Sequence, residues 1–234
     1  MATTMIKTGG IINKVRIDCR RWLFRLVIPI SLLFLSHFNE QFYLQPEHGS
    51  VAPLYLVRGL LFALGLWLSF RLEQILNDYE VEGRLVLNQT QKAFSGIFVW
   101  FVLWYGAWLV IYYPGSYTTD TLDAIKQISY LKLHDWFSIF HPLTYLFLYQ
   151  IFPHMVAIGI AQSLLVSFVF ADILSYFYTK FDFNPRLKYL TLLFVIGILS
   201  SITSVIYYTF FYMRDIPFNF LHFYLSFYVF RACL

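Results

Sequence analysis

The chain has 234 residues, of which 59% are hydrophobic, 21% are aromatic and only 13% are charged. Soluble domains carry about 25% charged residues, so this composition excludes a soluble globular protein and indicates an integral membrane protein whose main partner is the lipid bilayer. The formal net charge is +4, but Lys and Arg lie between apolar segments rather than along one exposed face, so no nucleic-acid partner is expected.

Six apolar segments are long enough to cross a bilayer, which takes about 20 residues. Because unpaired backbone groups are costly in lipid, each segment is predicted to be a helix. We therefore predict an all-α integral membrane fold with about six transmembrane helices. In chain order these helices cover residues 22–38, 51–70, 93–113, 154–178, 189–211 and 216–230.

The distribution of Lys and Arg predicts the orientation, because cytoplasmic loops are enriched in them. The first 21 residues hold five, and residues 71–92 and 180–188 hold three each, whereas residues 39–50 hold none. We expect a multi-pass protein of the cell membrane with a cytoplasmic N-terminus and an outer loop at 114–142. The predicted divisions are a cytoplasmic N-terminus (1–21), a two-helix hairpin with its cytoplasmic loop (22–92) and a membrane module (93–234).

Two further helices are predicted at the outer face. Thr119 or Asp120 can cap a helix start, and the apolar residues that follow recur at helical spacing. This pattern predicts an amphipathic helix that lies on the membrane with its apolar face down and Asp123 and Lys126 towards water. Residues 136–152 contain a hydrophobic piece of barely ten residues between two prolines, which is too short to span and predicts an interfacial or re-entrant helix.

Four residues on the predicted outer face are candidates for chemistry. Asp120 is either a helix cap or a general base at the hydrocarbon boundary. His141 is either hydrogen-bonded structure or a ligand for a phosphate or hydroxyl group. Arg214 and Asp215 are either an interfacial charge pair or part of a polar site. No metal site and no cofactor are predicted, because His and Asp show no metal-ligand spacing.

Arg58 lies about eight residues into an apolar segment, where an isolated cation is costly. We therefore expect it to face a protein partner or a polar cavity. The candidate partners within other apolar segments are Gln150, Gln162 and Asp172.

Several of these residues occur in an order that resembles a known family. The order is Tyr112-Tyr113-Pro114-Gly115, Asp120, His141-Pro142, Gln162 and Arg214-Asp215-Ile216-Pro217-Phe218. Over residues 93–230 it resembles the N-terminal part of bacterial GT-C membrane glycosyltransferases, and it is distantly similar to protein O-mannosyltransferases and the lipid A aminoarabinose transferase.

The resemblance implies inverting transfer of a sugar from a polyprenyl-phosphate-linked donor at the outer face, without a metal or cofactor. Asp120 would be the catalytic base, His141 and Arg214 would bind the lipid phosphate, and Asp215 would be a second acid of the site. GT-C enzymes are longer, so the resemblance also implies a truncated or N-terminal portion that lacks its C-terminal half or works with a partner subunit.

Two alternatives stay open. In a transporter or flippase component, Arg58, Asp172 and Asp215 would line a polar path. In a non-enzymatic multi-spanning protein, the helices would assemble with a partner, and Asp120 and Asp215 would tolerate replacement by Asn.

Overall fold

The structure is a computed structural model. It describes residues 7–44, 50–82, 88–113, 115–132, 140–180, 184–202, 205–206, 209, 211–212 and 215–233, and within them the backbone alone for residues 7–24, 76–82, 120, 140, 211–212 and 215–216.

The described part of the chain is all-α apart from one pair of short strands, which confirms the predicted class. The helices are α1 (Lys7–Tyr43), α2 (Ala52–Glu82), α3 (Gln89–Ile111), α4 (Thr119–Ser129), α5 (Phe140–Ile151), α6 (Val156–Lys180), α7 (Pro185–Ser201) and α9 (Asp215–Cys233). The strands β1 (Ser116–Tyr117) and β2 (Phe211–Tyr212) pair in parallel.

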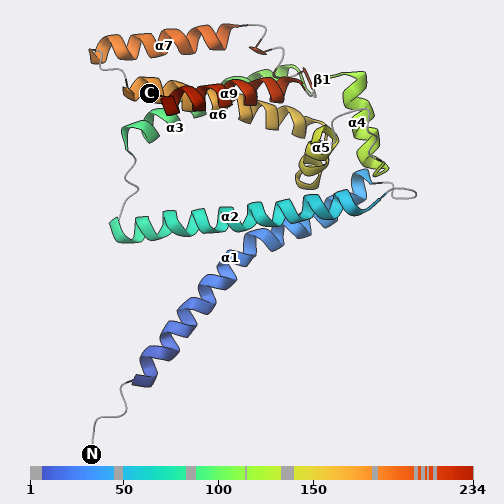
Figure 1. Cartoon of the computed structure of the whole chain (residues 1–234), viewed down its shortest axis with the longest axis vertical. Helices are drawn as coiled ribbons and strands as arrows, with labels where there is room; N and C mark the ends of the chain where they lie inside the picture. The colour runs from blue at the N-terminus through green and yellow to red at the C-terminus, as the bar shows by residue number, and fades with distance from the viewer. Residues whose placement is uncertain are drawn as a thin grey trace, which may run out of the picture.

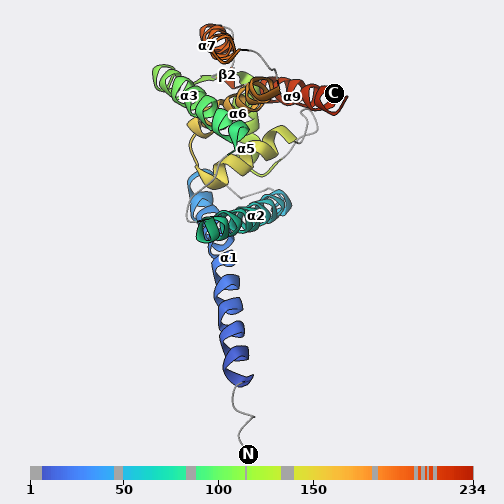
Figure 2. The same cartoon turned by 90° about the vertical axis from the view of Figure 1, so that its left-hand side faces the viewer.

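Helices α2, α3, α6, α7 and α9 run broadly along one direction, whereas α1 slants away from them (Figure 1). The strands, α4 and α5 lie at one end, which we call the α4 end, and the start of α3 lies with the ends of α6 and α9 at the opposite end. The N-terminal half of α1 extends away from all the other helices (Figures 1 and 2). At 37 residues, α1 is about 55 Å long and exceeds the roughly 30 Å of bilayer hydrocarbon.

Three described helical stretches are long and apolar enough to cross a membrane. They are Ala52–Ile75, Gln89–Ile111 and Val156–Lys180, which overlap three of the six predicted spans. These three stretches indicate a membrane protein. The boundaries predicted after residues 21 and 92 both fall inside helices, within α1 and α3.

Helices α1 and α2 form a hairpin that closes tightly at Gly65. A Cβ atom at Gly65 would lie 2.6 Å from the Cα atom of Pro29, which is closer than any van der Waals contact allows. Pro29 lies within α1. Glycine is therefore required here because the two helix backbones approach each other directly. At the far end of this crossing, Arg25 binds the Glu73 carboxylate through two nitrogens, at 2.7 and 3.2 Å.

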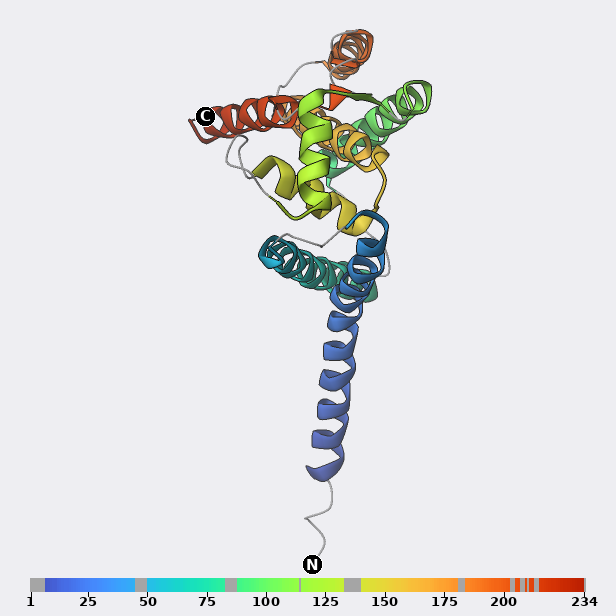
Figure 3. The ribbon, with the colours of Figure 1, turned by 90° about the vertical axis from the view of Figure 1, so that its right-hand side faces the viewer.

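Helix α4 is amphipathic, as predicted, but its apolar face covers protein. Ala124, Ile128 and Leu131 are buried, whereas Asp123 and Lys126 are exposed. The buried face packs on α5 in a core that also includes residues of α2 and α6 (Figure 3). The expectation that this face lies on the membrane was therefore wrong, because the side chains of α5 occupy it.

Helix α5 is short, as predicted. Its 12 residues span about 18 Å, too little to cross the hydrocarbon. Tyr145, Leu146, Tyr149 and Gln150 are buried, and α5 contacts α1, α2, α4 and α6. It joins the α1–α2 hairpin to the second core, in which α3 packs on α6 and α7.

Candidate functional site at the α4 end

The pairing of β1 with β2 brings together two segments that are 95 residues apart in the sequence. Ser116 pairs with Phe211 and Tyr117 with Tyr212, and both strands run in the same direction. Asp120 and Asp215 each follow a paired residue by three positions, in the first turn of α4 and at the first residue of α9. The two predicted acids therefore occupy matching backbone positions, each at a helix start. Arg214 lies outside the described residues.

Helix α4 begins with a cap that the sequence did not single out. Thr118 is the N-cap, and its hydroxyl oxygen accepts a hydrogen bond from the Thr121 amide at 3.1 Å. The prediction that Thr119 or Asp120 caps this helix was wrong. The reason is local: Thr118 has the extended backbone conformation that a cap requires, and Thr119 and Asp120 are already helical. Thr118 therefore fills the capping role that was the alternative to a general base for Asp120.

His141 lies in the first turn of α5 and is buried. The centroid of its ring is 4.4 Å from that of Tyr145, so the imidazole packs on the phenol. The Tyr145 hydroxyl is in turn close to the Thr121 hydroxyl, which opposes the effect of burial on the pKa of Tyr145. His141 is thus linked through one aromatic side chain to the residue that follows Asp120.

Tyrosines surround this link. Burial raises the pKa of Tyr145 and Tyr149 above that of an ordinary phenol. The neighbouring phenols of Tyr117 and Tyr145 raise the pKa of Tyr149 further. Tyr43 packs edge-on against Tyr149, with ring centroids 5.7 Å apart. We call Tyr43, Tyr117, Tyr145 and Tyr149 the tyrosine cluster. The hydroxyl oxygens of Tyr145 and Tyr149 are buried, and neither residue lines a pocket that the structure describes.

Arg58 belongs to a polar network between the hairpin and α5. It forms an ion pair with Glu40, and its Nε atom donates to the Ser36 hydroxyl at 3.3 Å. The Ser36 hydroxyl donates to the side-chain oxygen of Gln150, and the Gln150 amide nitrogen donates to the Tyr43 hydroxyl. Asn39 donates to the backbone carbonyl oxygens of Gln150 and Ile151, both at 2.9 Å.

The expectation that Arg58 has protein partners is confirmed, although its ion-pair partner was not foreseen. Gln150 joins Arg58 only through Ser36. Asp172 instead accepts a hydrogen bond from Tyr224 at 2.9 Å, between α6 and α9. Gln162 is buried in α6, and its side-chain amide has no hydrogen-bond partner within the described part of the chain.

One sequence signal could have revealed this network. The polar residues of α1 that face Arg58 and α5 follow helical spacing at the end of an apolar run, at positions i, i+3, i+4 and i+7. They are Ser36, Asn39, Glu40 and Tyr43. A polar stripe of this kind at the end of a membrane helix indicates a buried protein contact rather than a lipid-facing surface.

The described pockets lie at the other end of the molecule. One of about 660 Å³ is an apolar groove between α3 and α7, and one of about 470 Å³ lies between α3, α6 and α9. Among the side chains that the structure describes, no three His, Cys, Asp or Glu residues are grouped as metal ligands. At the α4 end, the structure brings together His141, the tyrosine cluster and the polar network around Arg58.

Comparison with known proteins gives no relative from which a role could be transferred: no family model, curated protein or solved structure matches this chain.

Proposed function

We propose that this chain is a GT-C-type glycosyltransferase, or the N-terminal portion of one, that uses a polyprenyl-phosphate-linked sugar at the outer face of the cell membrane. The observation that carries the proposal is the parallel pairing of Tyr117 with Tyr212. It supports a shared site because it gives Asp120 and Asp215 matching positions at one end of the helices.

The proposed topology has six crossings with a cytoplasmic N-terminus. The three apolar helices support it, as does the alternating chain direction of α2, α3, α6, α7 and α9 (Figure 1). In this topology the connections rich in Lys and Arg lie at the end opposite α4, where the positive-inside rule places the cytoplasm. The α4 end then faces outward, and α5 does not cross the membrane.

In the proposed reaction, the acceptor hydroxyl oxygen attacks the anomeric carbon of the donor sugar. The bond between that carbon and the phosphate oxygen breaks, and its electron pair leaves with the polyprenyl phosphate. Asp120 takes the acceptor proton, and inversion follows from attack on the face opposite the leaving group. Fixed cations and neutral hydrogen-bond donors stabilise the departing phosphate, which is the role we assign to Arg214 and His141. Asp215 completes the polar site.

The test compares two acids of the same helix. Membranes that contain the full chain, the Asp120→Asn variant or the Asp123→Asn variant are incubated with polyprenyl-phosphate-linked sugars, and the release of polyprenyl phosphate is measured. Loss of a general base costs about 100-fold or more in rate, so Asp120→Asn should lose transfer. Asp123 is exposed and accepts a hydrogen bond only from Gln127 within the described contacts, so Asp123→Asn should retain it. Transfer by Asp120→Asn would reject the catalytic role of Asp120, and no transfer by the unmodified chain with any donor would reject the proposal that this chain is active by itself.

Topology is tested separately by cysteine labelling in a background that lacks Cys19 and Cys233. Thr118→Cys and Tyr212→Cys should react with an impermeant reagent added to intact cells. Asn184→Cys, which is exposed at the opposite end, should react only after permeabilisation. Protection of Tyr212→Cys together with labelling of Asn184→Cys would contradict the proposed orientation.

A further inference from the structure

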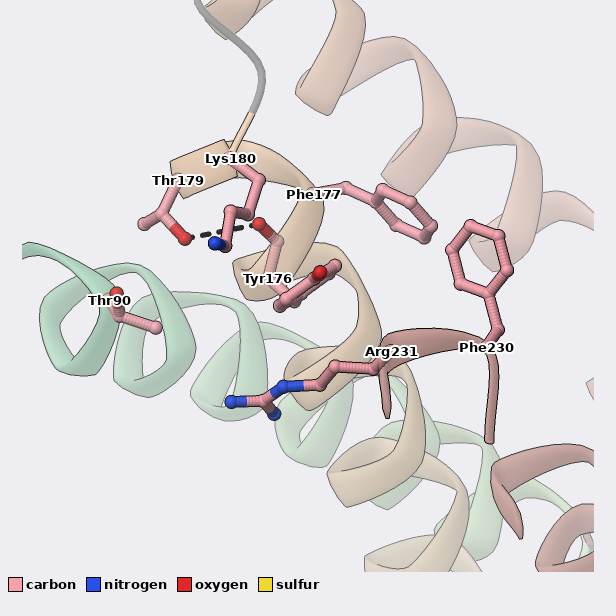
Figure 4. Close-up of a pocket in the computed structure, with 7 residues that line it drawn as sticks. All are labelled: Thr90, Tyr176, Phe177, Thr179, Lys180, Phe230 and Arg231. Atoms are coloured by element: carbon pink, nitrogen blue, oxygen red, sulfur yellow. Dashed lines mark hydrogen bonds between the residues drawn. The ribbon is translucent and has the colours of Figure 1, made fainter. Parts of the chain in front are cut away.

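A pocket of about 470 Å³ at the end opposite α4 has the features of an anion site. It lies between the first turn of α3 and the last turns of α6 and α9 (Figure 4). Thr90 enters it from α3, Lys180 from α6 and Arg231 from α9. Three elements that are distant in the sequence thus contribute polar side chains to one cavity.

The two cations of this pocket converge on one aromatic ring. The Arg231 guanidinium carbon lies 5.0 Å from the centroid of the Tyr176 ring, and the Lys180 ammonium nitrogen lies 6.0 Å from it. Figure 4 shows Arg231 extended past Tyr176 towards Thr90. Within the described residues, neither cation has a carboxylate within ion-pair distance, whereas Arg25 and Arg58 each have one. Two cations therefore line one cavity, and neither has a counter-ion among the described residues.

Helix dipoles explain part of this arrangement. A cation is favoured in the last turn of a helix, and Lys180 and Arg231 occupy the last turns of α6 and α9. That effect does not require the two cations to share a ring or a cavity. Thr90 lies in the first turn of α3, whose positive end adds to the field in the pocket.

The apolar residues that line this pocket are suited to contact the acyl chains of a lipid. Phe177 and Phe230 line the pocket, and the exposed fraction of Phe230 is 48%, so an apolar surface continues outward from the cations. Basic pockets between membrane helices on the cytoplasmic side are typical sites for anionic lipid head groups. We propose that this pocket binds the phosphate of an anionic phospholipid, with Lys180, Arg231 and the Thr90 hydroxyl as donors and the acyl chains beside Phe177 and Phe230. This site is separate from the α4 end. It rests on the proposed orientation, in which this end faces the cytoplasm, and not on the proposed transferase activity.

The test measures lipid binding by the full chain in detergent. Native mass spectrometry compares phosphatidylglycerol with zwitterionic phosphatidylcholine for the unmodified protein and for a Lys180→Gln/Arg231→Gln double variant. The control is Arg186→Gln/Lys188→Gln, which removes two cations from α7 at the same end. Arg186 is exposed and Lys188 is half-buried against the Tyr178 ring, and neither lines the pocket. Unfolding temperatures without added lipid verify that both variants fold.

We expect the unmodified protein to prefer phosphatidylglycerol, the pocket variant to bind it at least about tenfold more weakly, and the control variant to bind it within a factor of two or three. Equal loss in the control would show a general attraction to basic residues and overturn the site, as would unchanged binding by the pocket variant. An arm with inorganic phosphate separates the sources of the anion. Binding of phosphate without binding of the lipid would overturn the lipid assignment.

Discussion

Tyr117 and Tyr212 are paired in adjacent parallel strands, although 95 residues separate them in the sequence. Each is followed within three residues by an acid at the start of a helix, Asp120 in α4 and Asp215 in α9. Parallel strands require a long crossover connection, which here contains α4, α5, α6 and α7. The outer-face hypothesis therefore depends on this two-residue pairing more than on any side-chain contact.

The pairing predicts a specific cross-link. In a background without Cys19 and Cys233, Ser116→Cys and Phe211→Cys occupy partner positions and should form a disulfide on mild oxidation, because the Cα atoms of neighbouring strands lie within reach of one. The measurement is the mass difference before and after reduction. The register control, Thr118→Cys with Phe211→Cys, should cross-link far less. Equal cross-linking of both pairs would contradict the register.

The N-cap of α4 predicts a stability change. Thr118→Ala removes the acceptor for the Thr121 amide and should lower the free energy of unfolding by about 1 kcal/mol, whereas Thr118→Ser should keep most of it. Thermal unfolding in detergent, together with hydrogen exchange of the first α4 amides, measures the effect. Full stability in Thr118→Ala would show that another group caps this helix.

The helix crossing at Gly65 predicts opposite effects for two glycines of α2. Gly65→Ala places a methyl group 2.6 Å from the Cα atom of Pro29, so the helices must separate, at a cost of about 1–3 kcal/mol. Gly59→Ala meets no atom within 4 Å and should be neutral or stabilising by up to about 1 kcal/mol through helix propensity. The unfolding temperatures of the two variants check this prediction. A tolerated Gly65→Ala would show that α1 and α2 do not cross here.

The ion pair of Arg58 with Glu40 predicts strong coupling. Both side chains are about four-fifths buried, so removal of one partner leaves a poorly solvated charge and should cost on the order of 3 kcal/mol. The double variant Arg58→Met/Glu40→Gln should lose less than the sum of the single variants. A double-mutant cycle of unfolding free energies measures the coupling. Additive losses would mean that the pair contributes no interaction energy.

The tyrosine cluster predicts alkaline instability. Burial raises the folded-state pKa of Tyr145 and Tyr149 above the unfolded value of about 10, so the neutral phenols contribute no pH dependence below that value. Above it, the unfolded chain releases protons that the folded chain retains, and stability falls as pH rises.

The check is the unfolding temperature between about pH 8 and 11. Tyr145→Phe and Tyr149→Phe should each reduce the fall above pH 10, whereas Tyr130→Phe, an exposed tyrosine at the end of α4, should not. An identical pH profile in all three variants would show that these phenols ionise normally.

The sequence by itself determined the class of this protein and much of its local structure. The low charge and the long apolar segments indicate a membrane protein, and helices are the structure that satisfies backbone hydrogen bonds in such segments within lipid. The spacing of Ala124, Ile128 and Leu131 was enough to predict an amphipathic helix with Asp123 exposed. The shortness of α5 also follows from sequence, because two prolines bracket its hydrophobic piece.

Only the tertiary structure decided what these elements contact. An apolar face looks the same in sequence whether lipid or protein covers it, and so α4 was expected on the membrane but lies against α5. The partner of Arg58 was likewise hidden, because any polar residue within reach could serve, and the hairpin geometry selects Glu40. The pairing of Tyr117 with Tyr212 is set by how the intervening helices pack, a long-range property that no local pattern of residues encodes.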